Sequence, residues 1–185
     1  QAAGAEVVLV AGPVALATPP GVRRIDVDDA AQMLAATFAE IAGTDIFIAT
    51  AAVADYRPAQ PAAKKIKKTS ESLALEMQRT TDILAAVAAL AEPPFVVGFA
   101  AETDSVEQYA RQKLLKKKLD MIAANEVGHD KVFEKDDNAL LVLWRTGRRE
   151  LPQAPKSELA KQLVALIAEV YTETRVATRQ EQVRA

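Results

Sequence analysis

Short apolar runs alternate with amphipathic stretches along most of this chain of 185 residues. The apolar runs are rich in valine, isoleucine and phenylalanine, and they occupy residues 7–10, 22–27, 45–51, 95–100 and 121–124. Stretches with the 3.6-residue period of a helix begin near residues 28, 82, 105 and 157. Strands that alternate with helices form a sheet whose faces are both covered by helices. The sequence therefore predicts an α/β, Rossmann-like three-layer fold with a mostly parallel sheet.

The last third of the chain predicts an antiparallel edge hairpin and a final helix. Residues 138–145 and 149–151 flank Thr146-Gly147-Arg148, a turn sequence typical of hairpins. The helix from Ser157 places five apolar residues on one core-facing stripe, namely Leu159, Leu163, Leu166, Ile167 and Val170. We therefore expect one domain over residues 1–171. The polar residues 172–185 predict a C-terminal tail that frays.

Three local patterns refine this prediction. Asp28 or Asp29 is suited to cap a helix with one apolar face, formed by Met33, Leu34, Phe38 and Ile41. Leu73, Leu75 and Met77 alternate with polar or small residues, which predicts a half-exposed strand. Residues 1–6 resemble the last turn of a helix with its glycine exit. Because a strand precedes such a helix in a doubly wound fold, we expect that an N-terminal βα unit is missing.

Composition excludes several classes of function. The net charge of −2 and the pI of about 5.6 argue against general attraction to nucleic acid or to anionic membranes. The chain has no cysteine, which excludes thiolate chemistry and is compatible with a cytoplasmic location. His129 is the only histidine, so a multi-histidine metal site is excluded, and its GHDK context favours a loop. No segment approaches the roughly 20 apolar residues that span a bilayer, and we expect no signal peptide.

A basic loop follows the apolar run 45–51, which predicts a central strand of a parallel sheet. Residues 52–68 read AVADYRPAQPAAKKIKK, with Asp55 directly after the run and four lysines further on, at positions 64, 65, 67 and 68. Pro58 and Pro61 make the connection stiff. Ligands in open α/β sheets bind outside the carboxyl ends of the strands. The loop therefore predicts a site for an anion such as a phosphate compound, although lysine runs are more often solvated surface.

Three further groups of residues bear on chemistry. The stretch GFAAET over residues 98–103 offers a close backbone approach to a ligand, and Phe99 is either a stacking partner or a core residue. Lys113 and Lys117 share one side of a helix, where they either bind a polyphosphate or face solvent. Residues 81–84 begin a helix whose free amides suit an anion, although Asp82 can equally cap that helix.

The motifs AAVADYRP, KIKK, GFAAET and ARQK-x-x-x-K, in this order, resemble the phosphopantothenoylcysteine synthetase family of coenzyme A biosynthesis. The match is to the synthetase half of the bacterial bifunctional enzyme, whose other half is a flavin-dependent decarboxylase, and it extends to about Tyr171. The resemblance implies a ligase that joins 4′-phosphopantothenate to L-cysteine through an acyl-cytidylate. The reaction would consume CTP, release pyrophosphate and CMP, and need Mg²⁺. It also implies a homodimer in which the basic loop crosses the interface, a natural fusion or partner decarboxylase, and no flavin site in this chain.

The resemblance assigns roles to individual residues. Lys65 matches the family lysine that contacts the triphosphate and the activated intermediate, and it is the expected catalytic residue. Asp55 matches an acidic nucleotide-binding position. The metal ligands stay unknown: Mg²⁺ would be held mainly by the phosphates, and Asp55 is the one candidate contact from the chain. The other expected nucleotide-binding residues are Ala49, Thr50, Ala51, Thr81, Asp82, Ile83, Leu84, Phe99, Lys113 and Lys117. The family usually has Asn-Pro before Asp82, where this chain has Thr80-Thr81, and its N-terminal segment with an intermediate-handling asparagine has no counterpart here.

Two other classes of protein share parts of this pattern. An NAD(P)-dependent oxidoreductase or another Rossmann-type enzyme would have the same alternation of elements, but the chain contains no G-x-G-x-x-G motif. A non-catalytic RNA-binding module could use the lysines, but aromatic residues make up only 5% of the chain. Both classes stay open on the sequence alone.

Overall fold

The computed structural model describes residues 1–62, 64–67, 71–127 and 137–184, the last eight of these by their backbone only. Lys68 of the basic loop lies outside the described residues, as does His129, which the sequence places in a loop.

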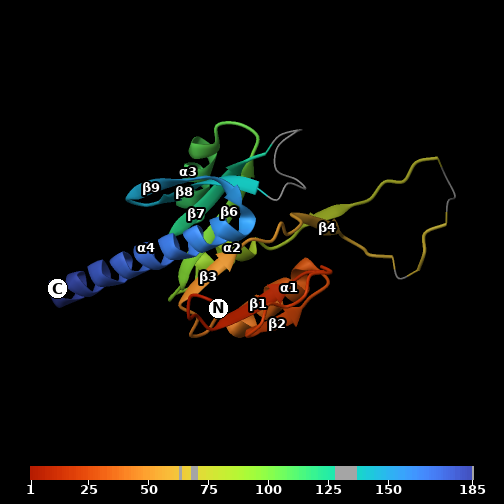
Figure 1. The fold of residues 1–185 in the computed structure, drawn as a ribbon. Helices are drawn as coiled ribbons and strands as arrows, with labels where there is room; N and C mark the ends of the chain where they lie inside the picture. Colours follow the sequence, from red (N-terminus) through yellow and green to blue (C-terminus); the bar gives the residue numbers. More distant parts are fainter. Residues whose placement is uncertain (63, 68–70, 128–136, 185) are drawn as a thin grey trace.

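A five-stranded sheet forms the centre of the molecule, with the strand order β3-β6-β7-β8-β9 (Figure 1). The strands are β3 (Ile46–Ala49), β6 (Phe95–Glu102), β7 (Met121–Glu126), β8 (Asp137–Trp144) and β9 (Gly147–Pro155). The pairs β3–β6 and β6–β7 are parallel, whereas β7–β8 and β8–β9 are antiparallel. The predicted edge hairpin is confirmed, with its two-residue turn at Arg145 and Thr146.

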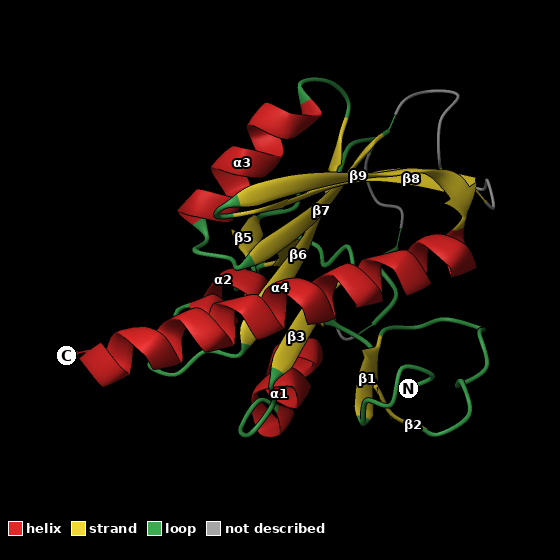
Figure 2. Cartoon of the chain, turned by 60° about the vertical axis from the view of Figure 1, so that its left-hand side comes forward, coloured by secondary structure: helices red, strands yellow, loops and turns green. Residues whose placement is uncertain are grey.

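Helices cover both faces of this sheet, which confirms the three-layer prediction (Figure 2). The helices α2 (Ile83–Ala88) and α3 (Val106–Lys116) pack on one face, where α1 (Ala30–Glu40) contributes partly buried side chains. The long helix α4 (Lys156–Arg184) covers the other face. Alternate residues of β6 supply the two cores: Phe95 and Val97 point toward α4, and Val96 and Ala100 toward α2 and α3.

Two small sheets lie beside the central one. The strands β1 (Val7–Ala11) and β2 (Val22–Asp26) pair in parallel. Within the described residues β1 pairs only with β2, and β3 pairs only with β6, so β1 and β3 each keep one edge without a strand. The prediction that residues 45–51 form a central strand is therefore wrong for the described residues, because β3 lies at the edge of its sheet.

The third sheet joins the two ends of a long loop. We call this loop, residues 56–79, the arm. The strands β4 (Tyr56–Pro58) and β5 (Met77–Arg79) pair antiparallel there. The predicted strand over residues 73–77 is wrong in extent, since only Met77 belongs to β5. Pro58 is the last residue of β4, and the Ala59 amide after it still donates to the Glu76 carbonyl at 2.9 Å.

Two helices differ in detail from the prediction. Asp29 caps α1, because its side chain accepts a hydrogen bond from the Gln32 amide at 2.8 Å. Phe38, predicted on the apolar face of α1, is exposed, and its neighbour Thr37 is buried instead. The buried face of the helix is therefore shifted by one residue there. All five predicted core residues of α4 are buried. That helix continues to Arg184, where glutamate, arginine and alanine favour a helix; the fraying of residues 172–185 stays a prediction.

Candidate functional site

The carboxyl end of β3 lies beside Gly98, four residues before the end of β6, since Ala49 pairs with Gly98 in the parallel ladder. Thr50 and Ala51, which follow β3, are exposed. The three predicted residues 49–51 therefore line the edge of the sheet at which α/β proteins bind their ligands.

Asp55 lies between this edge and the arm. The Thr80 amide donates to the Asp55 carbonyl at 2.9 Å, and the Thr80 hydroxyl donates to the Ala54 carbonyl at 2.6 Å. These two bonds hold the two ends of the arm together. They also place Asp55, whose carboxylate is exposed, close in space to residues 80–82.

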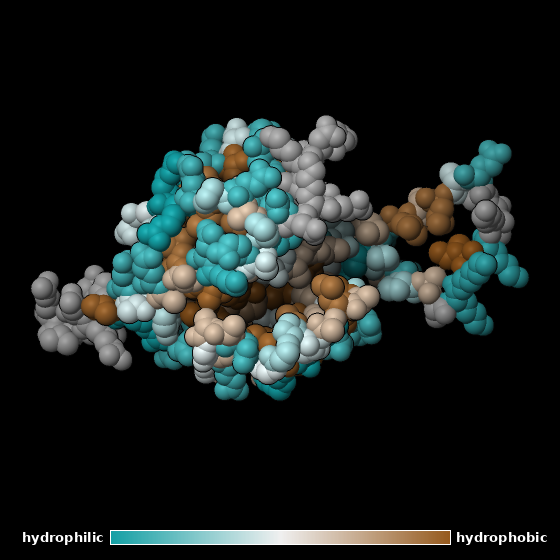
Figure 3. Space-filling model, in the orientation of Figure 1, coloured by the Kyte–Doolittle hydropathy of each residue, from teal (hydrophilic) through white to brown (hydrophobic). Residues whose placement is uncertain are grey.

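Lys65 belongs to the arm, which extends away from the sheet (Figure 1). It is exposed, as are its neighbours Lys64 and Lys67. Apolar side chains are exposed beside the lysines, including Ile66 at 54% and Leu73 at 64% (Figure 3). The structure therefore does not bring Lys65 to the other predicted site residues within one chain.

Asp82 has two partners. One carboxylate oxygen accepts the Ala85 amide at 3.0 Å, which confirms that Asp82 caps α2. The other lies 2.7 Å from the Lys117 ammonium. Partial burial is the largest single influence on the pKa of Asp82 and raises it. The hydrogen bonds from Lys117 and Ala85, with the charges of Lys117 and Arg79, outweigh burial and hold the pKa below its usual range.

The next two predicted residues serve the packing of α2. Ile83 is buried, and Leu84 lies over Gly98 of β6. A Cβ at Gly98 would lie 2.8 Å from Leu84 Cδ2 and 2.9 Å from Leu119 Cδ1. The glycine thus allows helix and strand to pack closely on this face, which is not available to a ligand. Thr81, just before the cap, is exposed.

Phe99 packs against the α4 side of the sheet, next to the core cluster that contains Phe95 and Val97. Lys113 and Lys117 extend from α3, which covers the opposite face. The structure therefore places Phe99 in the core and separates it from the two lysines by the sheet. The stacking role stays a prediction, and sequence spacing had left both interpretations open.

Lys113 has a partner that sequence reasoning missed. Its ammonium lies 2.6 Å from Oε1 of Glu102, the last residue of β6. The Glu102 side chain is only 14% exposed. The glutamate is visible in the GFAAET motif, but nothing in the local sequence indicates that a lysine 11 positions later reaches it.

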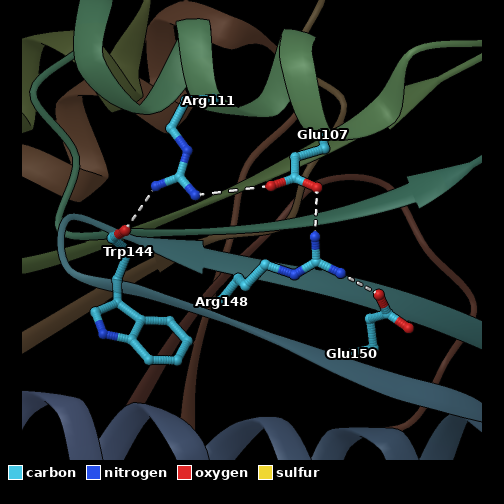
Figure 4. Close-up of polar contacts among 5 residues, drawn as sticks. All are labelled: Glu107, Arg111, Trp144, Arg148 and Glu150. Carbon is cyan, nitrogen blue, oxygen red and sulfur yellow. Dashed lines mark hydrogen bonds and ion pairs between the residues drawn. The ribbon is translucent and has the colours of Figure 1, made fainter.

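The other flank of α3 is tied to the β8–β9 hairpin (Figure 4). Arg111 donates to the Trp144 carbonyl at 2.9 Å, and Arg148 donates to Glu107 at 2.7 Å and also to Glu150. A hollow of about 290 Å³ lies beside these residues, and Asn125 also lines it. These contacts fix the position of α3, so that Lys113 and Lys117 extend from a helix anchored on its opposite flank.

The described part of the chain lacks both clusters of metal-binding side chains and helices that could cross a membrane. It contains no group of three or more histidine, cysteine, aspartate or glutamate side chains that could hold a metal ion. Among the described helices, none combines the length and the apolar character that crossing a membrane requires.

The family profile of the DNA/pantothenate metabolism flavoprotein C-terminal domain matches residues 1–171. The coenzyme A biosynthesis bifunctional protein CoaBC of Vibrio cholerae is 51% identical over 170 residues, which are 90% of this chain and 43% of that protein. The protein of the same name from Escherichia coli K12 is 48% identical over 175 residues, with 92% of this chain and 43% of that protein covered. The chain thus spans less than half the length of these relatives.

Two solved structures are similar to this chain. The crystal structure of the C-terminal domain of a coenzyme A biosynthesis bifunctional protein CoaBC matches with a TM-score of 0.76 and 35% identity, covering 92% of this chain and 76% of that one. A DNA/pantothenate metabolism flavoprotein from Streptococcus pneumoniae has a TM-score of 0.74 at 22% identity, covering 91% and 82% of the two chains, which shows a shared fold.

Proposed function

The chain belongs to the family of the DNA/pantothenate metabolism flavoprotein C-terminal domain, and we propose that it is the phosphopantothenate–cysteine ligase part of a coenzyme A biosynthesis protein. The relatives named for that biosynthesis, at up to 51% identity, support the proposal. This membership also disfavours the two alternatives left open by the sequence, an NAD(P)-dependent oxidoreductase and an RNA-binding module.

In the proposed reaction the carboxylate of 4′-phosphopantothenate attacks the α-phosphate of CTP, and pyrophosphate leaves. The amine of L-cysteine then attacks the acyl-cytidylate and displaces CMP. The first step brings two anions together, so a site for it must supply fixed positive charge and hold the reactants in line. Lys65, Lys113 and Lys117 would supply that charge.

The observation that carries the proposal is the placement of Lys113 and Lys117 on α3, beside the carboxyl ends of β3 and β6. Both are partly exposed, at 45% and 29% of their side chains, and each has a carboxylate partner within 2.7 Å. An arriving polyphosphate would meet two oriented ammonium groups. Residues 49–51 would accommodate the nucleoside at the strand end.

We propose Mg²⁺ as the metal of the reaction, held mainly by the phosphates of CTP. Magnesium in proteins typically binds one or two carboxylates together with substrate phosphates and water. The exposed Asp55 carboxylate at the strand end fits that set of donors. The ion would neutralise charge on the triphosphate.

We propose a homodimer in which the arm reaches the site of the partner subunit. The outward position of Lys65 supports this, because within one chain the arm leads away from the other site residues (Figure 1). The relatives are bifunctional proteins more than twice as long, which supports a decarboxylase part fused or bound to this one. Their role in metabolism favours the cytoplasm as the location.

The open strand edges support the expected additional βα unit. β1 lies on the side of β2 that faces β3 (Figures 1 and 2). Each of these strands keeps an unpaired edge among the described residues. We propose that a parallel strand from sequence ahead of Gln1 fits between them and joins the two sheets.

The decisive test is pyrophosphate release by the protein in its natural length. We expect release with CTP and Mg²⁺ only when 4′-phosphopantothenate is present, and formation of the cysteine adduct when L-cysteine is added. ATP in place of CTP tests the choice of nucleotide. Release that is independent of 4′-phosphopantothenate, or no release at all, would exclude the ligase function.

A further inference from the structure

Glu102 is a shielded carboxylate whose position in the fold is fixed by the sheet. It is the last residue of β6, where it pairs with Glu126 of β7, and its carbonyl accepts the Val127 amide at 2.8 Å. Its side chain is 14% exposed. Among the described residues, Lys113 is the only hydrogen-bond partner of its carboxylate, at 2.6 Å.

The two members of this ion pair differ in their exposure to solvent. The Lys113 side chain is 45% exposed, whereas the carboxylate is largely covered. Ion pairs between two fully exposed groups contribute little to stability. Here the Glu102 carboxylate belongs to the end of β6, and the Lys113 side chain extends toward solvent. The end of the sheet therefore holds the longer, more exposed lysine side chain.

The second lysine of the same helix face is held differently. Lys117 pairs with Asp82, which also caps α2. Lys113 and Lys117 are four residues apart, a spacing at which like charges repel on a helix. Two carboxylates from two different elements thus fix two lysines that would otherwise move apart.

We propose that Glu102 is a positioning residue of the nucleotide site: it orients the Lys113 ammonium before the triphosphate binds. The inference rests on the proposed function. A lysine side chain loses much rotamer freedom when it binds a phosphate, and a carboxylate that restricts it in advance lowers that cost. Glu102 acts through Lys113 and need not contact the nucleotide.

Loss of positioning and loss of charge predict opposite effects of Glu102→Ala on the affinity for CTP. Glu102→Ala removes a negative charge beside a phosphate site, so charge alone would tighten the binding of CTP. Loss of positioning would weaken it. We expect the Kd for CTP with Mg²⁺, measured by calorimetry, to rise about tenfold in Glu102→Ala. Glu102→Gln, whose amide oxygen still accepts a hydrogen bond from the ammonium, should stay within about threefold of the wild type.

A double-mutant cycle tests whether Glu102 acts through Lys113. Adding Glu102→Ala to Lys113→Ala should cause no further loss of CTP affinity, because the group that it positions is already absent. Glu158→Ala is the control: this glutamate is also ion-paired on a helix, with Lys161 of α4 on the other face of the sheet, and its loss should leave the Kd unchanged. Thermal unfolding of every variant identifies those that do not fold. If Glu102→Ala is one of them, binding of CTP by Glu102→Gln that is more than about threefold tighter than by the wild type overturns the positioning role.

The outcomes separate the inference from the function on which it rests. A wild-type protein that does not bind CTP overturns the proposed function and this inference with it. A wild type that binds CTP, together with a Glu102→Ala variant that binds it equally well or more tightly, overturns the positioning role alone. Additive losses in the double variant would also overturn it.

Discussion

Lys65 is the residue whose chemical role and structural role are most clearly separated. Its side chain is exposed on the arm, far from both core clusters, so a change there does not disturb packing. We expect Lys65→Gln to keep the unfolding temperature of the wild type and to lower kcat about 100-fold, the typical loss of a group that stabilises developing charge. Lys64→Gln, one position away, should lose far less. Equal kcat values for Lys65→Gln and the wild type would remove Lys65 from the catalytic site.

Asp82 predicts a pH-dependent stability. Because its pKa is lower in the folded protein, the ionised carboxylate stabilises the fold fully above the unfolded pKa of about 4, and this stabilisation is lost as the pH falls through the folded value. Asp82→Asn keeps a good N-cap but does not titrate. The wild type should therefore be more stable to urea than Asp82→Asn near pH 7, with the gap narrowing as the pH falls below the unfolded pKa of about 4. A gap that does not change with pH would contradict the role of the charge.

At the scale of elements, the close contact of α2 with β6 depends on Gly98. Gly98→Ala should destabilise the protein by about 1–3 kcal/mol, because the new methyl group overlaps the side chains of Leu84 and Leu119 in a packed core. Urea unfolding measures the loss. Gly12→Ala is the control: its Cβ would lie 3.9 Å from Met33 Cε, an ordinary contact, and it should unfold like the wild type. If both variants are equally stable, the packing explanation is wrong.

The elements also show what the sequence could predict. The buried strand β6 and the core stripe of α4 were predicted correctly, because apolar periodicity is strong where an element is buried on a whole face. The exposed face of α1 and the length of β5 were not, since Phe38 and Leu75 are apolar residues that no described neighbour buries. The pairs Glu102–Lys113 and Asp82–Lys117 depend on how α3 packs, which no local pattern reveals.

For the whole molecule, the proposed exchange of arms between subunits can be tested by mixing two inactive variants. If Lys65 serves the partner's site, a heterodimer of Lys65→Gln with Lys113→Gln contains one intact site. An equimolar mixture that exchanges subunits should then regain about a quarter of the wild-type activity, since half of the dimers are mixed and each has one of two sites. Each variant alone stays inactive and serves as the control. A mixture with no gain over its components would place both lysines in one chain's site.

The contact between α4 and the start of β3 limits the order in which this molecule can form. The Tyr171 hydroxyl donates to Asp45 at 3.0 Å across 126 positions of sequence, and its ring packs edge-on against Phe95 at 5.7 Å. Contacts this distant in sequence form slowly, because a long loop must close first. During synthesis, therefore, the sheet face under α4 stays uncovered until the helix has left the ribosome. The apolar side chains of Val97 and Met121 are exposed to other chains for that time, so a ribosome that stalls before residue 171 would release a chain prone to aggregate.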